Sequence, residues 1–281
     1  MRQLLAGAAG GCGGGREGPE CFDRKGPGPP APMNKVAIVT GSSSGIGAAC
    51  AIELARRGWS VVVNFSKNAD EAQKVVAQCQ GSIAVQADVG EDADCRRLAQ
   101  AALDKWGRID ALVNNAGTTK LVKHADLDGL SAEDFLRIYR LNVVGPFQMT
   151  RACAAALKAA KGAVVNVSSV ASLLGTGSSV AYGASKAALN AMSLSLARTL
   201  APEVRVNVVA PGYVDTPWQH AMLGTDKARQ AAERYASFVP LKDYARPADV
   251  ADAVAWLIEG ARLVTGEVVF VDGGLHITPP R

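Results

Sequence analysis

The chain has 281 residues, of which 48% are hydrophobic and 20% are charged, and its formal net charge is +4. This length suits one large α/β domain with a short appendage. Scattered lysines and arginines form no basic stripe of the kind that binds nucleic acid, and no stretch is long and apolar enough to predict a membrane span. The six cysteines lie far apart, without a Cys-x-x-Cys pair, and the three histidines are dispersed. We therefore expect neither a disulfide framework nor a metal site, and a reducing, cytoplasmic location.

Residues 1–32 differ from the rest of the chain, because glycine and proline crowd them and no periodic apolar pattern runs through them. This composition predicts a disordered N-terminal extension. Met33 stands directly before the first predicted strand. We expect it to be the natural start of the protein, or the preceding segment to be dispensable, with the folded domain spanning residues 33–281.

The stretch TGSSSGIG at residues 40–47 follows an apolar run at 35–39 and leads into a helical pattern. Gly41 suits the positive φ of a tight turn, Gly45 lets a ligand approach the backbone, and Gly47 lets the helix lie close to the strand. The helix N-terminus then presents free N–H groups and a positive dipole end, which favour a phosphate. We predict a nucleotide pyrophosphate site rather than a flexible loop, because a strand and a helix flank the turn.

Strands and helices alternate strictly along the chain. The predicted strands cover residues 35–39, 59–65, 82–87, 109–114, 162–168, 204–210 and 267–271. The predicted helices cover residues 48–57, 70–80, 91–106, 131–149, 182–200 and 247–258. This alternation predicts an α/β fold of the doubly wound, Rossmann type, with a parallel sheet of about seven strands and helices on both faces. The segment 211–240 is long and irregular by comparison, which is typical of a lid or a binding loop.

Tyr182 and Lys186 are four residues apart in an alanine-rich segment, so in a helix their side chains project from one face. A nearby positive charge favours phenolate and lowers the pKa of a tyrosine. A carbonyl that receives a hydride needs a proton on its oxygen, and a phenol can supply it. We predict Tyr182 as the proton donor, or acceptor in the oxidation direction, and Lys186 as the neighbour that lowers its pKa. A surface pair is the alternative reading of a tyrosine and a lysine one turn apart.

Several motifs occur in the order found in the classical short-chain dehydrogenase/reductase family, which the chain resembles from about residue 34 to residue 277. These motifs are TGSSSGIG (40–47), Asp88-Val89, NNAG (114–117), Asn142, Ser169, YGASK (182–186) and Pro211-Gly212. Within the family the chain is most similar to bacterial 3-oxoacyl-carrier-protein reductases and their relatives that act on other ketones or alcohols. The resemblance implies an enzyme that transfers a hydride between NAD(P) and a carbonyl or secondary alcohol.

The resemblance also implies four catalytic residues, of which Tyr182 and Lys186 are two. Ser169 follows the strand predicted at 162–168, where ligand-contacting residues of this fold lie, and the family uses it to orient and polarise the carbonyl. Asn142 lies inside a predicted helix, although asparagine is a poor helix former. In the family it binds a water that relays protons to Lys186, and a structural kink is the alternative.

The remaining motifs look like cofactor contacts. Asp88 and Val89 end the third predicted strand, where a carboxylate can accept from the adenine amino group. Asn114 is expected to brace neighbouring strands, and by resemblance Val214 and Thr216 meet the nicotinamide amide. The full set of predicted cofactor-binding residues is Gly41, Ser43, Ser44, Gly45, Ile46, Gly47, Asn64, Ser66, Lys67, Asp88, Val89, Asn115, Ala116, Gly117, Tyr182, Lys186, Pro211, Gly212, Val214 and Thr216.

Cofactor choice depends on the end of the second predicted strand. NAD enzymes of this fold place a carboxylate there, and a carboxylate would repel a 2′-phosphate. The chain has Asn64-Phe65-Ser66-Lys67 at this point, without an acid. Ser66 can donate a hydrogen bond to a phosphate and Lys67 supplies a charge, so we expect NADP(H), with NAD(H) as the alternative. Ser44 argues the other way, because many NADP-preferring relatives carry a basic residue there.

The substrate is a small carbonyl or alcohol whose identity the sequence leaves open. Residues 118–130 differ from the corresponding segment of the acyl-carrier-protein reductases, and Ala245 replaces a glycine of the family. A 3-oxoacyl-thioester reductase and a sugar (glucose-type) 1-dehydrogenase are the specific alternatives. A non-enzymatic NADP sensor is the alternative from another class, and an extended sugar-nucleotide epimerase ranks lower because such chains are longer.

The helices predicted at 131–149 and 182–200 offer flat surfaces suited to packing across a two-fold axis. We expect a homotetramer, as the family implies, with neither nucleic acid nor membrane as a partner.

Overall fold

A parallel sheet forms the centre of the computed structural model, which describes residues 34–278. The extension predicted at 1–32 and the boundary at Met33 lie outside the described residues. Seven described strands follow the order β3-β2-β1-β4-β5-β6-β7. They are β1 (Val36–Val39), β2 (Ser60–Phe65), β3 (Ile83–Gln86), β4 (Ala111–Asn114), β5 (Ala163–Val167), β6 (Arg205–Pro211) and β7 (Val268–Val271). The predicted fold class, a doubly wound parallel sheet, is confirmed.

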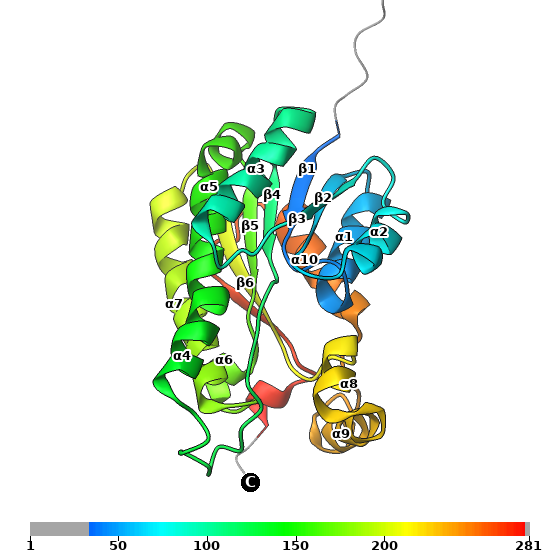
Figure 1. The fold of residues 1–281 in the computed structure, drawn as a ribbon, viewed down its shortest axis with the longest axis vertical. Coiled ribbons are helices and arrows are strands. Elements are labelled where there is room, and N and C mark those ends of the chain that lie inside the picture. Colours follow the sequence, from blue (N-terminus) through cyan, green and yellow to red (C-terminus); the bar gives the residue numbers. More distant parts are fainter. Residues whose placement is uncertain (1–33, 279–281) are drawn as a thin grey trace, which may run out of the picture. The chain divides into compact units, whose positions relative to one another are not determined.

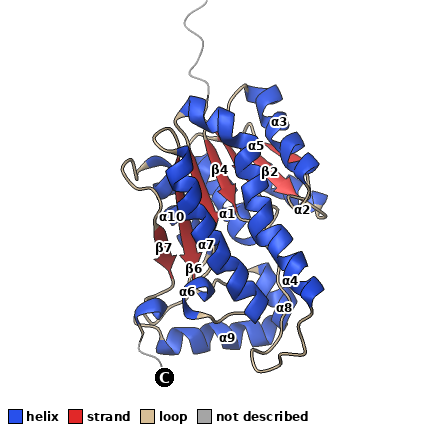
Figure 2. Cartoon of the chain, turned by 90° about the vertical axis from the view of Figure 1, so that its left-hand side faces the viewer, coloured by secondary structure: helices blue, strands red, loops and turns tan. Residues whose placement is uncertain are grey.

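Helices cover both faces of this sheet (Figure 1; Figure 2). One face carries α1 (Gly45–Arg56), α2 (Ala69–Val76) and α10 (Pro247–Glu259). The other face carries α3 (Asp92–Trp106), α5 (Gly145–Ala160) and α7 (Val180–Leu200). Crossover helices on both sides are what a parallel sheet requires, because each strand must return to the same edge.

Alternation along the strands divides the hydrophobic core into two layers. In β1, Ala37 and Val39 pack with α1 and α10, whereas Val36 and Ile38 pack with α3 and α5. All four side chains are fully buried. A strand buried on both faces reads as a continuous apolar run, which is why VAIV shows no alternation of polar and apolar residues.

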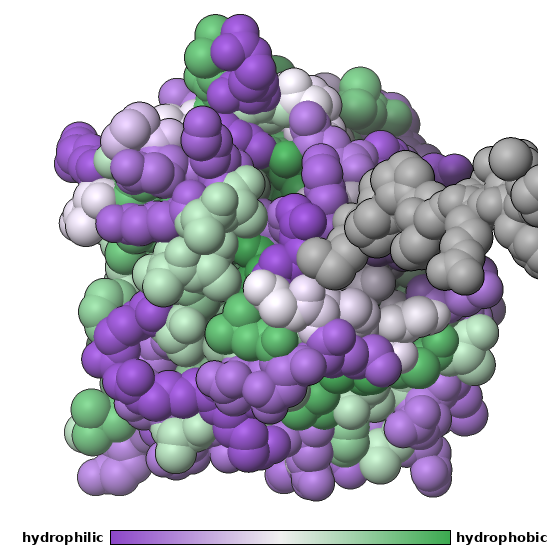
Figure 3. All heavy atoms as spheres, turned by 90° about the horizontal axis from the view of Figure 1, so that it is seen from above, coloured by the Kyte–Doolittle hydropathy of each residue, from purple (hydrophilic) through white to green (hydrophobic). Residues whose placement is uncertain are grey.

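The strand order reverses direction between β1 and β4, since β2 and β3 lie on one side of β1 and β5 to β7 lie beyond β4. Ligands of this fold bind outside the carboxyl ends of the strands at such a switch point. The opposite edge, where the strands begin, is seen in Figure 3 and presents mainly hydrophilic side chains around smaller hydrophobic patches. We therefore expect a ligand site at the carboxyl edge of the sheet.

The helix predicted at 131–149 is divided in the structure. It consists of α4 (Ala132–Tyr139), a π-helical turn η1 (Arg140–Val144) and the beginning of α5. Ser131 caps α4 by accepting a hydrogen bond from the backbone N–H of Asp134, and the Asp134 carboxylate accepts from the backbone N–H of Ser131. The predicted helix is present and continues to Ala160, but its π turn was not predicted, because the periodicity of the apolar residues does not distinguish a π turn from an α turn.

The segment predicted as irregular, 211–240, contains two helices, α8 (Pro217–Leu223) and α9 (Thr225–Phe238). Thr216 accepts a hydrogen bond from the Gln219 N–H at the start of α8, and Gly224, with a φ of 80°, separates the two helices. These are ordinary start and stop signals, so this prediction was wrong although the signals are present. Two shorter elements, α6 (Ala171–Leu174) and η2 (Leu275–Ile277), were also not predicted. Within residues 34–278 we find no helix with the length and apolar character needed to cross a membrane.

Candidate active site

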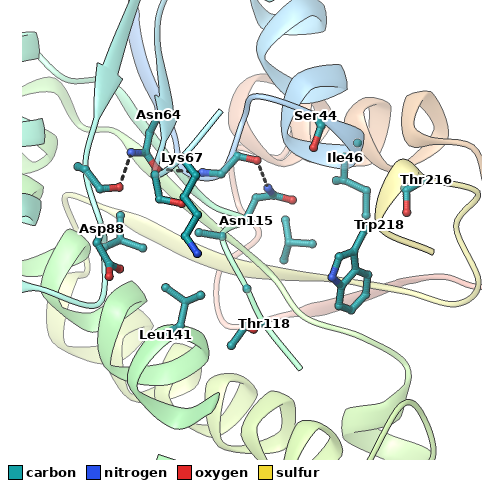
Figure 4. A pocket seen from close by; sticks show the side chains of 18 of the residues that line it. Ser44, Ile46, Asn64, Lys67, Asp88, Asn115, Thr118, Leu141, Thr216 and Trp218 are labelled. Carbon is teal, nitrogen blue, oxygen red and sulfur yellow. Dashed lines mark hydrogen bonds between the residues drawn. The ribbon is translucent and has the colours of Figure 1, made fainter. Parts of the chain in front are cut away.

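A cavity of about 540 Å³ opens at the carboxyl edge of the sheet. Most of the predicted site residues line it, which places residues far apart in the sequence around one space (Figure 4). These are Gly41, Ser44, Gly45, Ile46, Asn64, Ser66, Lys67, Asp88, Val89, Asn115, Ala116, Gly117, Tyr182, Lys186 and Thr216. The cavity is therefore both the switch-point crevice of the fold and the meeting place of the sequence motifs.

Two glycines of the turn between β1 and α1 have no room for a side chain. Gly41 has a φ of 59°, and a Cβ on it would lie 2.9 Å from the Cα of Ala116. A Cβ on Gly47 would lie 2.4 Å from the carbonyl oxygen of Gly41 and 2.5 Å from the Nδ2 of Asn115. Glycine is therefore required on steric grounds at both positions, and the backbone is open to a close ligand.

Helix α1 begins at this turn with its N–H groups facing the cavity. The Ser44 side chain makes no capping hydrogen bond, and the first turn of the helix contains no acidic residue. The first N–H groups of a helix have no intrahelical partner, and the dipole adds positive character. An anionic diphosphate fits this cradle in charge, in hydrogen bonding and in the space that the glycines leave.

Asn115 and Asn64 hold the turn in place. The Nδ2 of Asn115 donates to the carbonyl oxygens of Thr40 and Gly41, both at 3.0 Å. Asn64 accepts from the Gly41 N–H at 3.0 Å through Oδ1 and donates to the Ala87 carbonyl at 3.1 Å through Nδ2. Both residues line the cavity, but their side-chain amides stabilise the backbone that a cofactor would meet.

Asp88 is held by two donors at the far end of the cavity. Its Oδ1 accepts from the Gly90 N–H at 2.9 Å, and its Oδ2 accepts from the Arg140 guanidinium at 2.9 Å. Arg140 also pairs with Glu91 at 2.7 Å. Figure 4 shows Asp88 and Trp218 at opposite ends of the cavity. The carboxylate is thus fixed in direction at the end opposite Trp218.

Asn114 braces neighbouring strands, as predicted. Its Nδ2 donates to the Oδ1 of Asn166 in β5 at 2.8 Å, and the Nδ2 of Asn166 donates to the hydroxyl of Ser193 in α7 at 2.8 Å. All three residues are buried. This chain of hydrogen bonds connects β4, β5 and α7 directly beneath the cavity.

Helix α7 carries Tyr182 and Lys186 one turn apart, and both line the cavity. Lys186 is 4% exposed and donates a hydrogen bond from Nζ to the carbonyl oxygen of Val167, the last residue of β5, at 2.8 Å. Burial away from water disfavours the ammonium form and lowers the pKa of Lys186 to about 8. The lysine is therefore a buried cation without a carboxylate partner among residues 34–278.

Burial also raises the pKa of Tyr182, to about 12, while a hydrogen bond with the Ser169 hydroxyl acts in the opposite direction. The sequence argument predicted a lowered pKa. The structure differs because the phenolate is withdrawn from water, and because the Nζ of Lys186 lies 5.8 Å from the centre of the tyrosine ring and donates to Val167. In the protein alone, Tyr182 keeps its proton at neutral pH.

Asn142 occupies the π-helical turn η1 and is fully buried. Its Oδ1 accepts from the Thr118 N–H at 2.8 Å, and its Nδ2 donates to the Thr118 carbonyl and to the Ser185 hydroxyl, both at 3.0 Å. A π turn displaces one residue from the regular helical ladder, and such turns are frequent at functional sites. The structure shows the helix irregularity here, and the asparagine ties the chain after β4 to α7.

Some predicted site residues do not line the cavity. Gly212 serves packing, because a Cβ on it would lie 2.0 Å from the Tyr235 hydroxyl, and Val214 forms a backbone bridge with Ala245. The predicted residues outside the lining are Ser43, Gly47, Asn142, Ser169, Pro211, Gly212 and Val214.

Other lining residues were not predicted. They are Ala87, Thr118, Leu141, Val167, Ser168 and Trp218. The Thr216-Pro217 pair, a capping residue followed by proline, was the sequence signal that could have placed Trp218 at the start of a helix. Within the described part of the chain, no three His, Cys, Asp or Glu side chains come together as a metal site requires.

A family model described as enoyl-(acyl carrier protein) reductase matches residues 41–276. A protein named as ketoacyl reductase 2 of the granaticin polyketide synthase, from Streptomyces violaceoruber, is 44% identical over 88% of this chain and 98% of its own length. Glucose 1-dehydrogenase 2 of Bacillus subtilis is 35% identical over 88% of this chain and 96% of its own. The solved structure of the Thermoplasma acidophilum aldohexose dehydrogenase is similar with a TM-score of 0.79 at 28% identity, covering 89% of this chain and 96% of that one.

The fold and the glycine turn at its switch point are those of a nucleotide-binding α/β protein. The chain belongs to the classical short-chain dehydrogenase/reductase family. It is an NAD(P)-dependent oxidoreductase, and relatives named as a ketoacyl reductase and as a glucose 1-dehydrogenase each align with 88% of its length.

Proposed function

We propose that this enzyme interconverts a ketone and a secondary alcohol with Tyr182 as the acid and base, Ser169 as the residue that orients the carbonyl, and Lys186 as the charge that supports the developing alkoxide. One observation supports the proposal above the others. The Ser169 hydroxyl lies close enough to Tyr182 to lower the pKa of the phenol, and Tyr182 lies one helical turn from the buried Lys186, all at the carboxyl end of β5. Two hydroxyls and one cation thus converge where a carbonyl oxygen would be held.

When bound, the nicotinamide supplies the hydride or takes it up. The raised pKa of Tyr182, about 12, keeps the phenol protonated at neutral pH, ready to donate to the oxygen of a carbonyl that is being reduced. Alcohol oxidation needs the phenolate instead. The positive charge of Lys186 favours that phenolate and any alkoxide beside it.

We assign Asn142 to the proton relay that would restore the proton on Tyr182. The side-chain amide of Asn142 is held by the π turn and by its hydrogen bonds to Thr118 and Ser185. It therefore lies between the cavity wall and α7. A water donating to the Thr118 carbonyl would extend this group toward Lys186.

We propose NADP(H) as the preferred cofactor. Ser66 and Lys67 line the cavity beyond the end of β2, both are exposed, and the ammonium of Lys67 has no partner among the described residues. The acidic side chain nearest in the lining, Asp88, is paired with Arg140. A 2′-phosphate would therefore meet a free cation and a hydroxyl, without an unpaired carboxylate.

The test is Lys67→Glu, compared with Lys227→Glu, an exposed lysine on α9 outside the cavity lining. Loss of a charge-assisted hydrogen bond should raise the KM for NADPH by roughly tenfold, with little change for NADH. The control should leave both values unchanged. Equal effects on NADPH and NADH would contradict the preference.

We propose that the enzyme has one of two activities, that of a 3-oxoacyl-thioester reductase or that of a sugar 1-dehydrogenase, which are the two classes that the relatives represent. A screen of ketones, 3-oxoacyl thioesters and aldoses with both cofactors, followed by the absorbance of the reduced nicotinamide, tests the activity directly. Failure of every carbonyl and alcohol with either cofactor, while the protein binds the cofactor, would contradict the proposed function.

We propose a homotetramer in the cytoplasm. The surfaces of α4 and α5 expose large apolar side chains, Leu136 at 70% and Phe147 at 42%, which assembly would cover. The described cysteines, including the buried Cys50 and Cys153, are free thiols, as a reducing compartment favours. Light scattering at micromolar concentration tests the assembly, and a monomer would contradict it.

A further inference from the structure

Trp218 is a large side chain left uncovered beside the proposed catalytic phenol. It lines the cavity and is 43% exposed, and its ring centre lies 6.3 Å from that of Tyr182 with a tilt of 43°. Its indole N–H has no partner among the described residues. We propose that Trp218 is the platform that recognises the substrate, and that the substrate is a neutral, flat ring ketone or the corresponding alcohol. This inference rests on the proposed function and names its substrate class.

The backbone holds Trp218 firmly at the start of α8. Thr216, which is buried, caps the helix, and Pro217 occupies its first turn. The Cγ2 of Thr216 would lie 3.6 Å from a Cβ on Gly45, so the beginning of α8 sits against the glycine turn. An exposed aromatic ring on a fixed helix start presents a rigid surface, which costs little entropy when a second ring covers it.

Charge within the cavity favours a neutral substrate. Lys67 lies with Ser66 near the end of β2, whereas Lys186 is committed to the carbonyl of Val167. Asp88 lies at the end opposite Trp218 (Figure 4). No arginine belongs to the described lining of the cavity. A carboxylate or phosphate on the substrate would therefore meet no arginine in the described lining, and the one cation near Tyr182, Lys186, already donates to the Val167 carbonyl and supports the reacting oxygen.

A rim of two connected segments also lies against Tyr182. A Cβ on Gly177 would lie 3.3 Å from the ring of Tyr182, so the backbone passes directly against the phenol. The next residue, Ser178, accepts from the Val122 N–H at 2.9 Å and shares a hydrogen bond with the Thr119 hydroxyl at 2.6 Å. Tyr182 thus has both this rim and Trp218 as close neighbours. A flat molecule can lie against the indole and still bring its carbonyl to the phenol, whereas a flexible chain would cover the indole only by losing conformational freedom.

The test compares 2-tetralone, a flat bicyclic ketone, with 2-decanone, an open-chain ketone with the same number of carbons. Both are assayed with parent enzyme, Trp218→Ala, Trp218→Phe and Trp256→Ala. Trp256 on α10 is 48% exposed and outside the cavity lining, so its replacement is the matched control. A titration of 2-tetralone in the presence of oxidised cofactor, followed by tryptophan fluorescence, adds a readout without turnover.

Trp218→Ala should raise the KM for 2-tetralone by at least about tenfold while changing that for 2-decanone by less than about twofold. Trp218→Phe should recover most of the affinity for 2-tetralone, and Trp256→Ala should match the parent. Equal effects of Trp218→Ala on both ketones, or turnover of 2-decanone without turnover of 2-tetralone, would overturn the inference while leaving the proposed function in place. No turnover of any ketone by an enzyme that binds its cofactor would overturn both.

Discussion

The two ends of the cavity are built in different ways. At the glycine turn, the side chains of Asn64 and Asn115 form hydrogen bonds with the backbone of the turn. The backbone is also closely packed there, since neither Gly41 nor Gly47 has space for a Cβ. Where Trp218 lies, a large ring projects with 43% of its surface uncovered. The first end is preorganised for one ligand geometry, and the second offers surface that a substrate completes.

Because the two ends differ in this way, we expect only a small part of the chain to select the substrate. A diphosphate needs a fixed set of N–H donors, so the turn that presents them tolerates little change. We propose that substrate recognition depends on side chains carried by α8 and on the rim around residues 119–124 and 177–178, which lie outside the strands of the sheet. Mutations at the two ends should therefore separate stability and cofactor affinity from substrate choice.

The largest effect is expected from Gly47→Ala. Its methyl group would meet the Gly41 carbonyl at 2.4 Å and the Asn115 amide at 2.5 Å, so the turn or the helix must shift. Overpacking of this kind should lower the free energy of unfolding by about 3 kcal/mol and weaken cofactor binding by at least tenfold. Urea unfolding and a cofactor titration measure both.

Gly58→Ala is the control for that experiment. Gly58 has a φ of 86°, but a Cβ there would meet nothing within 4 Å. Strain alone should cost about 1 kcal/mol in the free energy of unfolding and leave cofactor affinity unchanged. If Gly47→Ala behaved like Gly58→Ala, the turn would be less rigid than its contacts indicate.

Lys186→Met should have a smaller effect on the free energy of unfolding than Gly47→Ala, and it should stabilise the protein at neutral pH. The pKa of Lys186 is about 8 in the folded protein and about 10.4 in an unfolded chain, so the unfolded state binds the extra proton between these values. The parent should therefore gain stability relative to the variant as the pH rises from 8 to 10.4. At neutral pH the free energy of unfolding of the variant should be about 1 kcal/mol higher than that of the parent. The variant should nevertheless lose activity. A pH-independent difference in urea unfolding would contradict the buried, unpaired charge.

The smallest effect is expected at the rim. Lys120 pairs with Asp134 at 2.6 Å, and its side chain is 43% exposed. Exposed pairs contribute little, so Lys120→Ala should change the free energy of unfolding by less than about 0.5 kcal/mol and leave cofactor affinity unchanged. A large loss of cofactor affinity would show that the two ends of the cavity are more closely connected than this comparison holds.

Much of the cofactor end could be predicted from the sequence, because its signals are local. TGSSSGIG lies within one strand, turn and helix, and the spacing of Tyr182 and Lys186 follows from one helical turn. The roles of Asn64 and Asn115 could not be predicted in the same way. Their amides reach the turn from β2 and from the end of β4, and that meeting depends on how the strands lie side by side.

The substrate end was harder to predict for a different physical reason. Helix α8 has no buried residue and α9 buries only Ala228, Ala232 and Tyr235, so neither helix has the long apolar face of the helices that cover the sheet. The direction of the Tyr182 pKa also depends on burial and on the carbonyl that Lys186 contacts, neither of which a spacing in the sequence specifies.

The central claim is that Tyr182 is the acid and base of an oxidoreductase whose cofactor site is independently built. Tyr182→Phe removes one hydroxyl, keeps the ring beside Trp218 and leaves the glycine turn intact. With a ketone that the parent enzyme reduces, kcat should fall by at least about a hundredfold while cofactor affinity stays within about twofold of the parent. Turnover near the parent rate would contradict the mechanism.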